Sequence, residues 1–211
     1  MNINNTNSRR NFLSKMLVTG LSGVALLTSA TYAKGGNTGR GGANTTSTTD
    51  DSTSTDSVES TSSVMTEEQK DMLFFIYQEE KVARDVYITL GNIYTNENTF
   101  ASIQLSEQRH IDSARGLCEK YDVSIDGVDE ESVGNFVLPV LQELYDTCVA
   151  EGEKSLLDAL KVGELIEITD IDDLEHASVG MPEDVVKVYD SLLEGSLSHL
   201  DAFTTAIARE A

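Results

Sequence analysis

The chain has 211 residues, with 36 Asp and Glu against 15 Lys and Arg, a formal net charge of −21 and 39% apolar residues. This length predicts one domain, or two at most, with enough apolar residues for one core but not for a membrane channel. The negative charge disfavours nucleic acid and anionic membrane surfaces as partners and favours cations. Two cysteines are too few for a disulfide scaffold or a four-thiolate site, so a bound metal would need oxygen and nitrogen ligands.

Residues 1–33 have the features of a cleaved export signal. They contain no acidic residue, and Ser8-Arg9-Arg10-Asn11-Phe12-Leu13 resembles a twin-arginine signal. The mildly apolar run over residues 16–30 is shorter than the about 20 residues of a membrane-spanning helix, which disfavours a permanent anchor. We therefore expect an exported protein, periplasmic or extracellular, without stable membrane insertion.

Residues 34–64 are rich in Gly, then in Ser, Thr and Asp, and contain almost nothing that can enter a core. This composition predicts a flexible, disordered linker. The folded domain is therefore expected over residues 65–211.

Apolar residues in this domain recur at helical spacing, which predicts an all-α fold. A capping box at Thr66-Glu67-Glu68-Gln69 opens a first helix that reaches about Leu90. The other predicted helices cover about 100–121, a shorter stretch over 139–150, then 155–176 and 182–208. Pro139 and Pro182 suit the first turns of two of them.

Each of the four long helices carries an apolar stripe that is interrupted near its middle by polar residues. These residues are Glu80 in the first helix, Glu107 and His110 in the second, Glu167 and Asp170 in the third, and Ser196 and His199 in the fourth. An unpaired carboxylate in an apolar interior costs several kcal/mol, and no Lys or Arg shares these stripes. Two divalent cations would balance the four carboxylates.

The spacing of these residues is typical of a dinuclear metal site. Bundle sites of this kind use a Glu from each of two helices and Glu-x-x-His from each of the other two. Glu80 and Glu107-x-x-His110 match one half of that pattern, with the Glu and His on one helix face. The other half is altered to Glu167-x-x-Asp170 and Ser196-x-x-His199, and Asp170 is a candidate to replace the missing Glu. Oxygen and nitrogen ligands favour iron or manganese over structural zinc.

The domain resembles the ferritin-like superfamily, and in particular the uncharacterised bacterial and archaeal family named domain of unknown function 2202. Four blocks carry the resemblance: Glu79–Tyr87, Ser106–His110, Glu167–Leu174 and Gly195–Phe203. The resemblance implies a ferritin-like four-helix bundle with a carboxylate-bridged di-iron centre. The stretch between the second and third long helices, with its short helix, matches the long crossover of such bundles.

Two iron ions, or manganese, are thus the expected cofactors, and small oxidants the expected partners. The predicted ligands are Glu80, Glu107, His110, Glu167, Asp170 and His199. The resemblance implies redox chemistry with oxygen, peroxide or ferrous iron. Because Ser196 stands where a Glu is expected, a non-catalytic metal-binding or sequestering protein, or an interaction module with a vestigial site, is the alternative. A homodimer is compatible with the sequence.

Several assignments stay open at this point. Glu79 competes with Glu80, and Glu164 with Glu167, while Glu80 is also placed to pair with Arg84. Cys118 and Cys148 either form one disulfide or stay as buried thiols.

Two other features are expected to have no part in the metal site. Tyr87 and Tyr121 lie two turns or more from the predicted ligands, so we expect packing and a hydroxyl hydrogen bond rather than a radical role. Asp122-x-Ser124-x-Asp126-Gly127 imitates the start of a calcium loop, but Val133 occupies the twelfth position, so a solvated turn is expected.

Overall fold

The computed structural model describes residues 65–210, so the predicted export signal and linker lie outside the described residues. Within this range the secondary structure is entirely helical, with five helices and no strand. The helices are α2 (Glu67–Ile93), α3 (Asn98–Lys120), α4 (Pro139–Gly152), α5 (Leu156–Ala177) and α6 (Glu183–Glu210). The predicted all-α class and the five predicted helices are confirmed.

Local sequence signals explain where the helices begin. The backbone N–H of Gln69 donates to Thr66 Oγ1 (3.2 Å), and the N–H of Thr66 donates to Gln69 Oε1 (2.8 Å), which is the predicted capping box. Pro139 occupies the first turn of α4, where its missing N–H costs nothing. At the start of α5 the N–H of Asp158 donates to Ser155 Oγ (3.0 Å).

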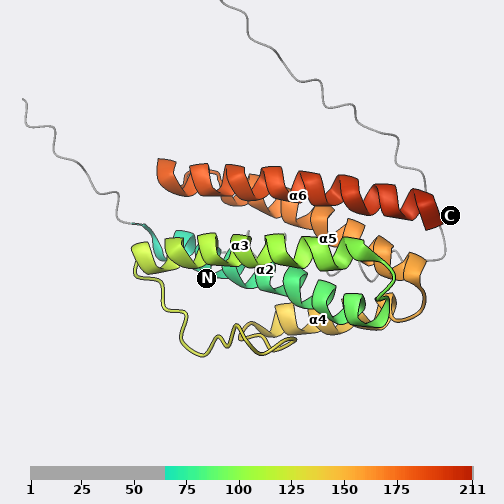
Figure 1. Ribbon diagram of the computed structural model, residues 1–211. Coiled ribbons are helices and arrows are strands. Elements are labelled where there is room, and N and C mark those ends of the chain that lie inside the picture. Colours follow the sequence, from blue (N-terminus) through green and yellow to red (C-terminus); the bar gives the residue numbers. More distant parts are fainter. Residues whose placement is uncertain (1–64, 211) are drawn as a thin grey trace, which may run out of the picture.

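The four long helices lie side by side, and α4 runs along one side of them (Figure 1). Helix α2 packs against α3 and α5, and α6 packs against the same two helices, so the four surround one shared interior. Helix α4 also packs on α2 and α5. None of the helices in the described part of the chain is both long and apolar enough to cross a membrane.

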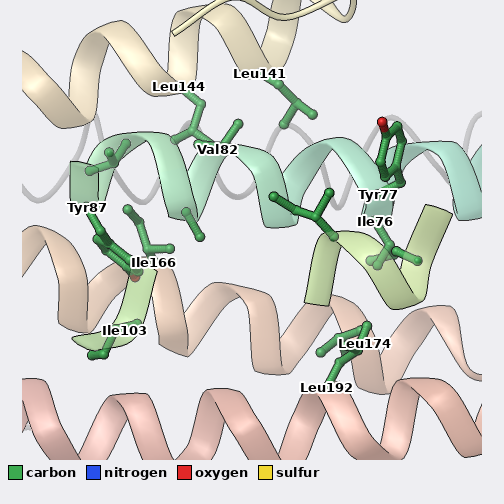
Figure 2. Packing of buried hydrophobic residues seen from close by; sticks show 14 of the residues in the cluster. Ile76, Tyr77, Val82, Tyr87, Ile103, Leu141, Leu144, Ile166, Leu174 and Leu192 are labelled. Atoms are coloured by element: carbon green, nitrogen blue, oxygen red, sulfur yellow. The ribbon is translucent and has the colours of Figure 1, made fainter. Parts of the chain in front are cut away.

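Helix α2 is buried on more than one face. Residues 75–87 are all buried, because α4 and the segment before it cover the side of α2 that faces away from the shared interior. Figure 2 shows Leu141 and Leu144 of α4 reaching toward α2, on the side where Val82 lies. Polar residues on every side of α2 must therefore find partners inside the protein.

One set of buried charges ties the crossover segment to the outer side of α2. Lys81 Nζ donates to Asp85 Oδ2 (2.6 Å) and to the backbone oxygen of Ser132 (2.8 Å). Arg84 Nη2 donates to Asp85 Oδ1 (2.7 Å), and the N–H of Gly134 donates to Asp85 Oδ2 (2.9 Å). No helical pattern in the sequence indicates this network.

Candidate metal centre

The polar residues that interrupt the four apolar stripes are all buried in the shared interior. They are Glu80 of α2, Glu107 and His110 of α3, Glu167 and Asp170 of α5, and Ser196 and His199 of α6. All of them except Glu167 lie one turn from a buried apolar residue on the same helix face, such as Ile76 and Ala83 around Glu80. Helical periodicity therefore turns all of them inward.

Glu80, Glu107 and His110 form a first group. His110 Nδ1 lies 3.1 Å from Glu80 Oε2 and 3.0 Å from Glu107 Oε2. One potential ligand atom from each residue lies within 4.8 Å of the other two, so a single cation could contact all three.

Glu107, Glu167 and His199 form a second group that meets the same criterion. His199 Nδ1 lies 2.8 Å from Glu107 Oε1 and 3.5 Å from Glu167 Oε2. Glu107 therefore belongs to both groups, with one carboxylate oxygen toward each histidine. The two imidazole rings stack with centroids 5.4 Å apart and planes inclined by 29°. Glu107 is therefore placed as a carboxylate between two cations would be.

Several polar atoms of the two groups are buried without a hydrogen-bond partner. They include Glu80 Oε1, Glu107 Oε1 and His199 Nδ1. The last two atoms lie at ion-pair distance from each other, 2.8 Å, without forming an aligned hydrogen bond. Buried polar atoms are nearly always paired, and oxygen and imidazole nitrogen atoms without donors suit bound cations.

Burial and neighbouring charges raise the pKa values of two of the three carboxyl groups and lower that of the third. Burial raises the pKa of Glu80 to about 7, although His110 opposes this. Burial and the charge of Glu107 raise the pKa of Glu167 to about 8. Burial acts in the same sense on Glu107, but His110 and His199 outweigh it and lower its pKa to about 2. Glu107 is thus the carboxylate that stays ionised.

Both histidines have raised pKa values. Burial lowers the pKa of each imidazole, but Glu107 and Glu80 outweigh it at His110 and raise its pKa to about 11. Glu107 and Glu167 likewise raise the pKa of His199 to about 9. In the absence of a metal, protons therefore balance the buried carboxylates, and bound cations would displace them.

Asp170 lies beside the two groups without joining either. Ser196 Oγ donates to Asp170 Oδ2 (2.6 Å), while Asp170 Oδ1 is buried without a partner. Burial and the charges of Glu80 and Glu167 raise the pKa of Asp170. Ser196, at the position of the expected fourth-helix Glu, thus orients the carboxylate that was predicted to replace it.

The rival residues lie outside both groups. Glu79 is buried, but the charges that act most strongly on it come from Asp173 and Asp170 rather than from a histidine. Glu164 is partly exposed and accepts a hydrogen bond from Thr204 Oγ1 (3.2 Å). Arg84 pairs with Asp85 and not with Glu80.

Tyr87 is closer to the centre than its position along α2 indicates. Its hydroxyl donates to Glu167 Oε1 at 2.6 Å. The predicted hydroxyl hydrogen bond is confirmed, but the expectation that Tyr87 is remote from the predicted ligands is wrong, because α5 carries Glu167 across the interior to it. Tyr121, at the end of α3, instead donates to Asp184 Oδ1 (2.6 Å).

Gly195 of α6 is a second residue that the sequence analysis did not assign to the site. A Cβ atom at this position would lie 2.4 Å from His110 Nε2. The absence of a side chain lets the imidazole pack against α6 while Nδ1 faces the carboxylates. A glycine in the middle of a predicted helix is the signal that could have indicated this close approach.

The remaining sequence features lie apart from the two groups. Cys118 and Cys148 are buried free thiols, and burial raises the pKa of Cys118 to about 12. The segment that imitates a calcium loop forms turns, in which the N–H of Asp126 donates to Ser124 Oγ (3.2 Å).

The fold and the site together define an all-helical protein with a buried cluster of carboxylates and histidines. The chain belongs to the family described as "Uncharacterized protein domain (DUF2202)", whose sequence model matches residues 69–211. "Uncharacterized protein MJ0754" of Methanocaldococcus jannaschii is 44% identical over 140 residues, which cover 66% of this chain and 75% of that protein. The crystal structure of the hypothetical protein MJ0754 from Methanococcus jannaschii aligns with a TM-score of 0.66 at 40% identity, over 69% of this chain and 83% of that chain. Neither name states an activity.

Proposed function

We propose that this protein is a ferritin-like four-helix-bundle protein that holds two iron ions between α2, α3, α5 and α6. The observation that carries the proposal is the placement of Glu107, whose two oxygens lie 3.0 Å and 2.8 Å from the Nδ1 atoms of two different histidines. Glu80 and Glu167 complete the two groups, and the long crossover with α4 is in keeping with ferritin-like bundles.

Charge supports the same proposal. The two groups and Asp170 bring four buried carboxyl groups together with two imidazoles. Divalent cations would replace the protons that these groups otherwise hold. The ligand atoms are oxygen and imidazole nitrogen, which suit iron and also manganese.

Two ferrous ions, when bound, supply the two electrons that reduce hydrogen peroxide to water or oxygen to hydrogen peroxide, with two protons taken up. The chain itself supplies position and environment. Glu107 is held between the histidines, the Tyr87 hydroxyl fixes one oxygen of Glu167, and Ser196 fixes one oxygen of Asp170. Phe100 and Phe203 pack against Tyr87 and exclude water from that end of the centre.

Metal binding without turnover is the second candidate function. The observation that favours it is the position of Asp170, which belongs to neither group while Ser196 replaces the fourth-helix Glu. In this case the protein would sequester metal, and no oxidant would react.

Anaerobic loading of the metal-free full-length chain with ferrous iron, followed by peroxide and then by oxygen, separates the two candidates. About two ions per chain with rapid oxidation supports a reactive centre. Binding without oxidation supports sequestration, and no stoichiometric binding leaves an interaction module.

The isosteric variant Glu107→Gln is the most direct test of the ligand set. It removes the negative charge that both groups share and replaces one of the two oxygens with an amide nitrogen, so it should abolish loading at both positions, as should Glu107→Ala. The matched control is Glu164→Gln on the partly exposed side of α5, which should load like the wild type. A Glu107→Gln protein that still binds two ions would contradict the proposal.

We also propose that the protein is exported, on the basis of the Arg9-Arg10 pair and the apolar run that follows it. A chain with both arginines changed to lysine should stay inside the cell, whereas a Lys15→Arg chain should still be exported. Fractionation of cells that express each chain tests this, and export of the double-lysine chain would contradict it.

A further inference from the structure

The candidate centre is closed off from solvent. His110 and His199, the most exposed of the residues in the two groups, are each only 7% exposed. A cation that binds there must pass between helices, and a path without ligands would require it to lose its hydration shell without compensation.

A line of three carboxyl groups leads from the surface of α5 toward the centre. Asp173 lies one turn after Asp170 on the same face of α5 and is partly exposed, whereas Asp170 is buried. Among the neighbouring charges, those of Asp173 and then of Asp170 act most strongly on Glu79 of α2. The charges of Glu80 and Glu167 in turn act most strongly on Asp170. The order from solvent to the centre is therefore Asp173, Glu79, Asp170.

Unsatisfied buried atoms on this line and beside it come from three helices. Glu79 is 6% exposed and Asp170 is 5% exposed, and each has one oxygen, Oε2 and Oδ1 respectively, without a hydrogen-bond partner. The hydroxyl of Tyr189 on α6 is also buried without a partner, near enough to Glu80 and Glu79 for their charges to act on it. The charges that act most strongly on Glu79 are all negative. Buried oxygens of this kind attract a cation.

We propose that Asp173, Glu79 and Asp170 form a relay through which divalent cations pass from the surface of α5 into the buried centre. This inference rests on the proposed metal-binding function and adds the route by which the metal arrives. Asp173 binds the ion first at the surface, and Glu79 binds it next, between α2 and α5. The free Oδ1 of Asp170 then binds the ion, which passes from there to the groups that contain Glu80 and Glu167. Ser196 keeps that oxygen available by holding the other one.

The arrangement suits passage rather than storage. In the described part of the chain, the sets of residues that could hold an ion together are the two groups of the centre, and neither contains Glu79 or Asp173. Oxygens that follow one another without enclosing an ion bind it weakly, so the ion can leave again toward stronger ligands.

The rate of loading tests the relay. The metal-free full-length chain is mixed anaerobically with ferrous iron, uptake is stopped at intervals with an excess of a coloured ferrous chelator, and the final iron content is measured after desalting. Asp173→Asn and Glu79→Gln each remove one charge of the line, and Asp172→Asn removes the exposed charge next to it on α5. Circular dichroism establishes that each variant is folded, and the partly exposed position of Asp173 makes its variant the safer one.

We expect Asp173→Asn and Glu79→Gln to slow the rate of loading by up to about tenfold, with the same final iron content. The reason is that a negatively lined path raises cation on-rates by about 10- to 1,000-fold. Their loading should also depend less on ionic strength, whereas Asp172→Asn should behave like the wild type.

Unchanged rates in both variants would overturn the relay and leave the proposed function standing. A Glu79→Gln protein that loads at the normal rate but holds less iron would also overturn it, because Glu79 would then be a ligand. A wild-type chain that takes up no iron would refute the proposed function and the relay together.

Discussion

His110 packs directly against the backbone of α6 at Gly195. Because a Cβ at this position would lie 2.4 Å from Nε2, the Gly195→Ala variant must displace the imidazole. Its Nδ1 would then leave Glu80 and Glu107. We expect metal binding by the first group to weaken by about 10- to 100-fold, as when residues that orient a ligand are changed. Calorimetric titration with manganese measures this.

Gly116 of α3 provides the control for this variant. A Cβ there would meet nothing within 4 Å, so Gly116→Ala should leave binding unchanged and stabilise the helix by about 0.5 to 1 kcal/mol. Normal affinity in Gly195→Ala would mean that His110 does not contribute to binding through the observed orientation.

The Tyr87 hydroxyl supplies the hydrogen bond to Glu167 Oε1 deep in the interior. Tyr87→Phe leaves that oxygen without its donor, and we expect the metal-free protein to lose about 1 to 3 kcal/mol of unfolding free energy. Tyr121→Phe deletes an equivalent 2.6 Å bond to Asp184, but Asp184 is partly exposed and water can replace the donor, so its loss should be smaller. Urea denaturation compares the two, and an equal or larger loss at Tyr121 would count against the interior role of Tyr87.

At the scale of single helices, the sequence was sufficient to predict the elements and the inward stripes. Period-3.6 spacing and the Thr66 capping box depend only on residues close together in the chain, so they can be recognised without the fold. The same spacing placed Glu80, Glu107 and Glu167 in the interior, where the structure has them.

Contacts between helices could not be predicted in this way. Tyr87 looked remote because distance was judged along α2, whereas its partner Glu167 comes from α5. From the sequence, Ser196 is only a missing ligand, whereas in the fold it orients Asp170. The buried charges on the outer side of α2 were missed because nothing in the sequence of α2 indicates that α4 and the segment before it cover that side.

Those outer charges make α2 sensitive to the loss of one partner. Lys81 and Asp85 are both fully buried and 2.6 Å apart, so Lys81→Met leaves a buried carboxylate short of a donor and frees two backbone oxygens. We expect a loss of about 3 to 5 kcal/mol in unfolding free energy. Lys187→Met breaks the same type of i, i+4 pair on the exposed side of α6 and should cost about 0.5 kcal/mol or less. Urea denaturation measures the unfolding free energy of both variants. Similar losses of unfolding free energy would show that burial of the Lys81 pair does not matter.

For the molecule as a whole, the chain carries a net charge of −21 and also places carboxyl groups in its interior. Both features disfavour the folded state as pH rises, because deprotonation adds to repulsion at the surface and to desolvation inside. Only bound protons or cations can offset the free-energy cost of the buried carboxylates. The stability of the metal-free and metal-bound forms should therefore depend on pH in different ways.

In the metal-free form, burial raises the pKa values of Glu80 and Glu167 from 4.5 to about 7 and about 8, and nearby carboxylates raise those of His110 and His199 from 6.5 to about 11 and about 9. Above about pH 4.5, and up to the raised pKa values, the folded state then binds more protons than the unfolded state. The unfolding free energy therefore falls as pH rises over that interval. Divalent cations displace those protons and bind more tightly at higher pH. We expect manganese to raise the melting temperature more at pH 8 than at pH 6, whereas Glu107→Gln should show no manganese effect at either pH. A manganese effect that is equal at both pH values, or larger at pH 6, would show that the protons and the metal do not compete for the same buried groups.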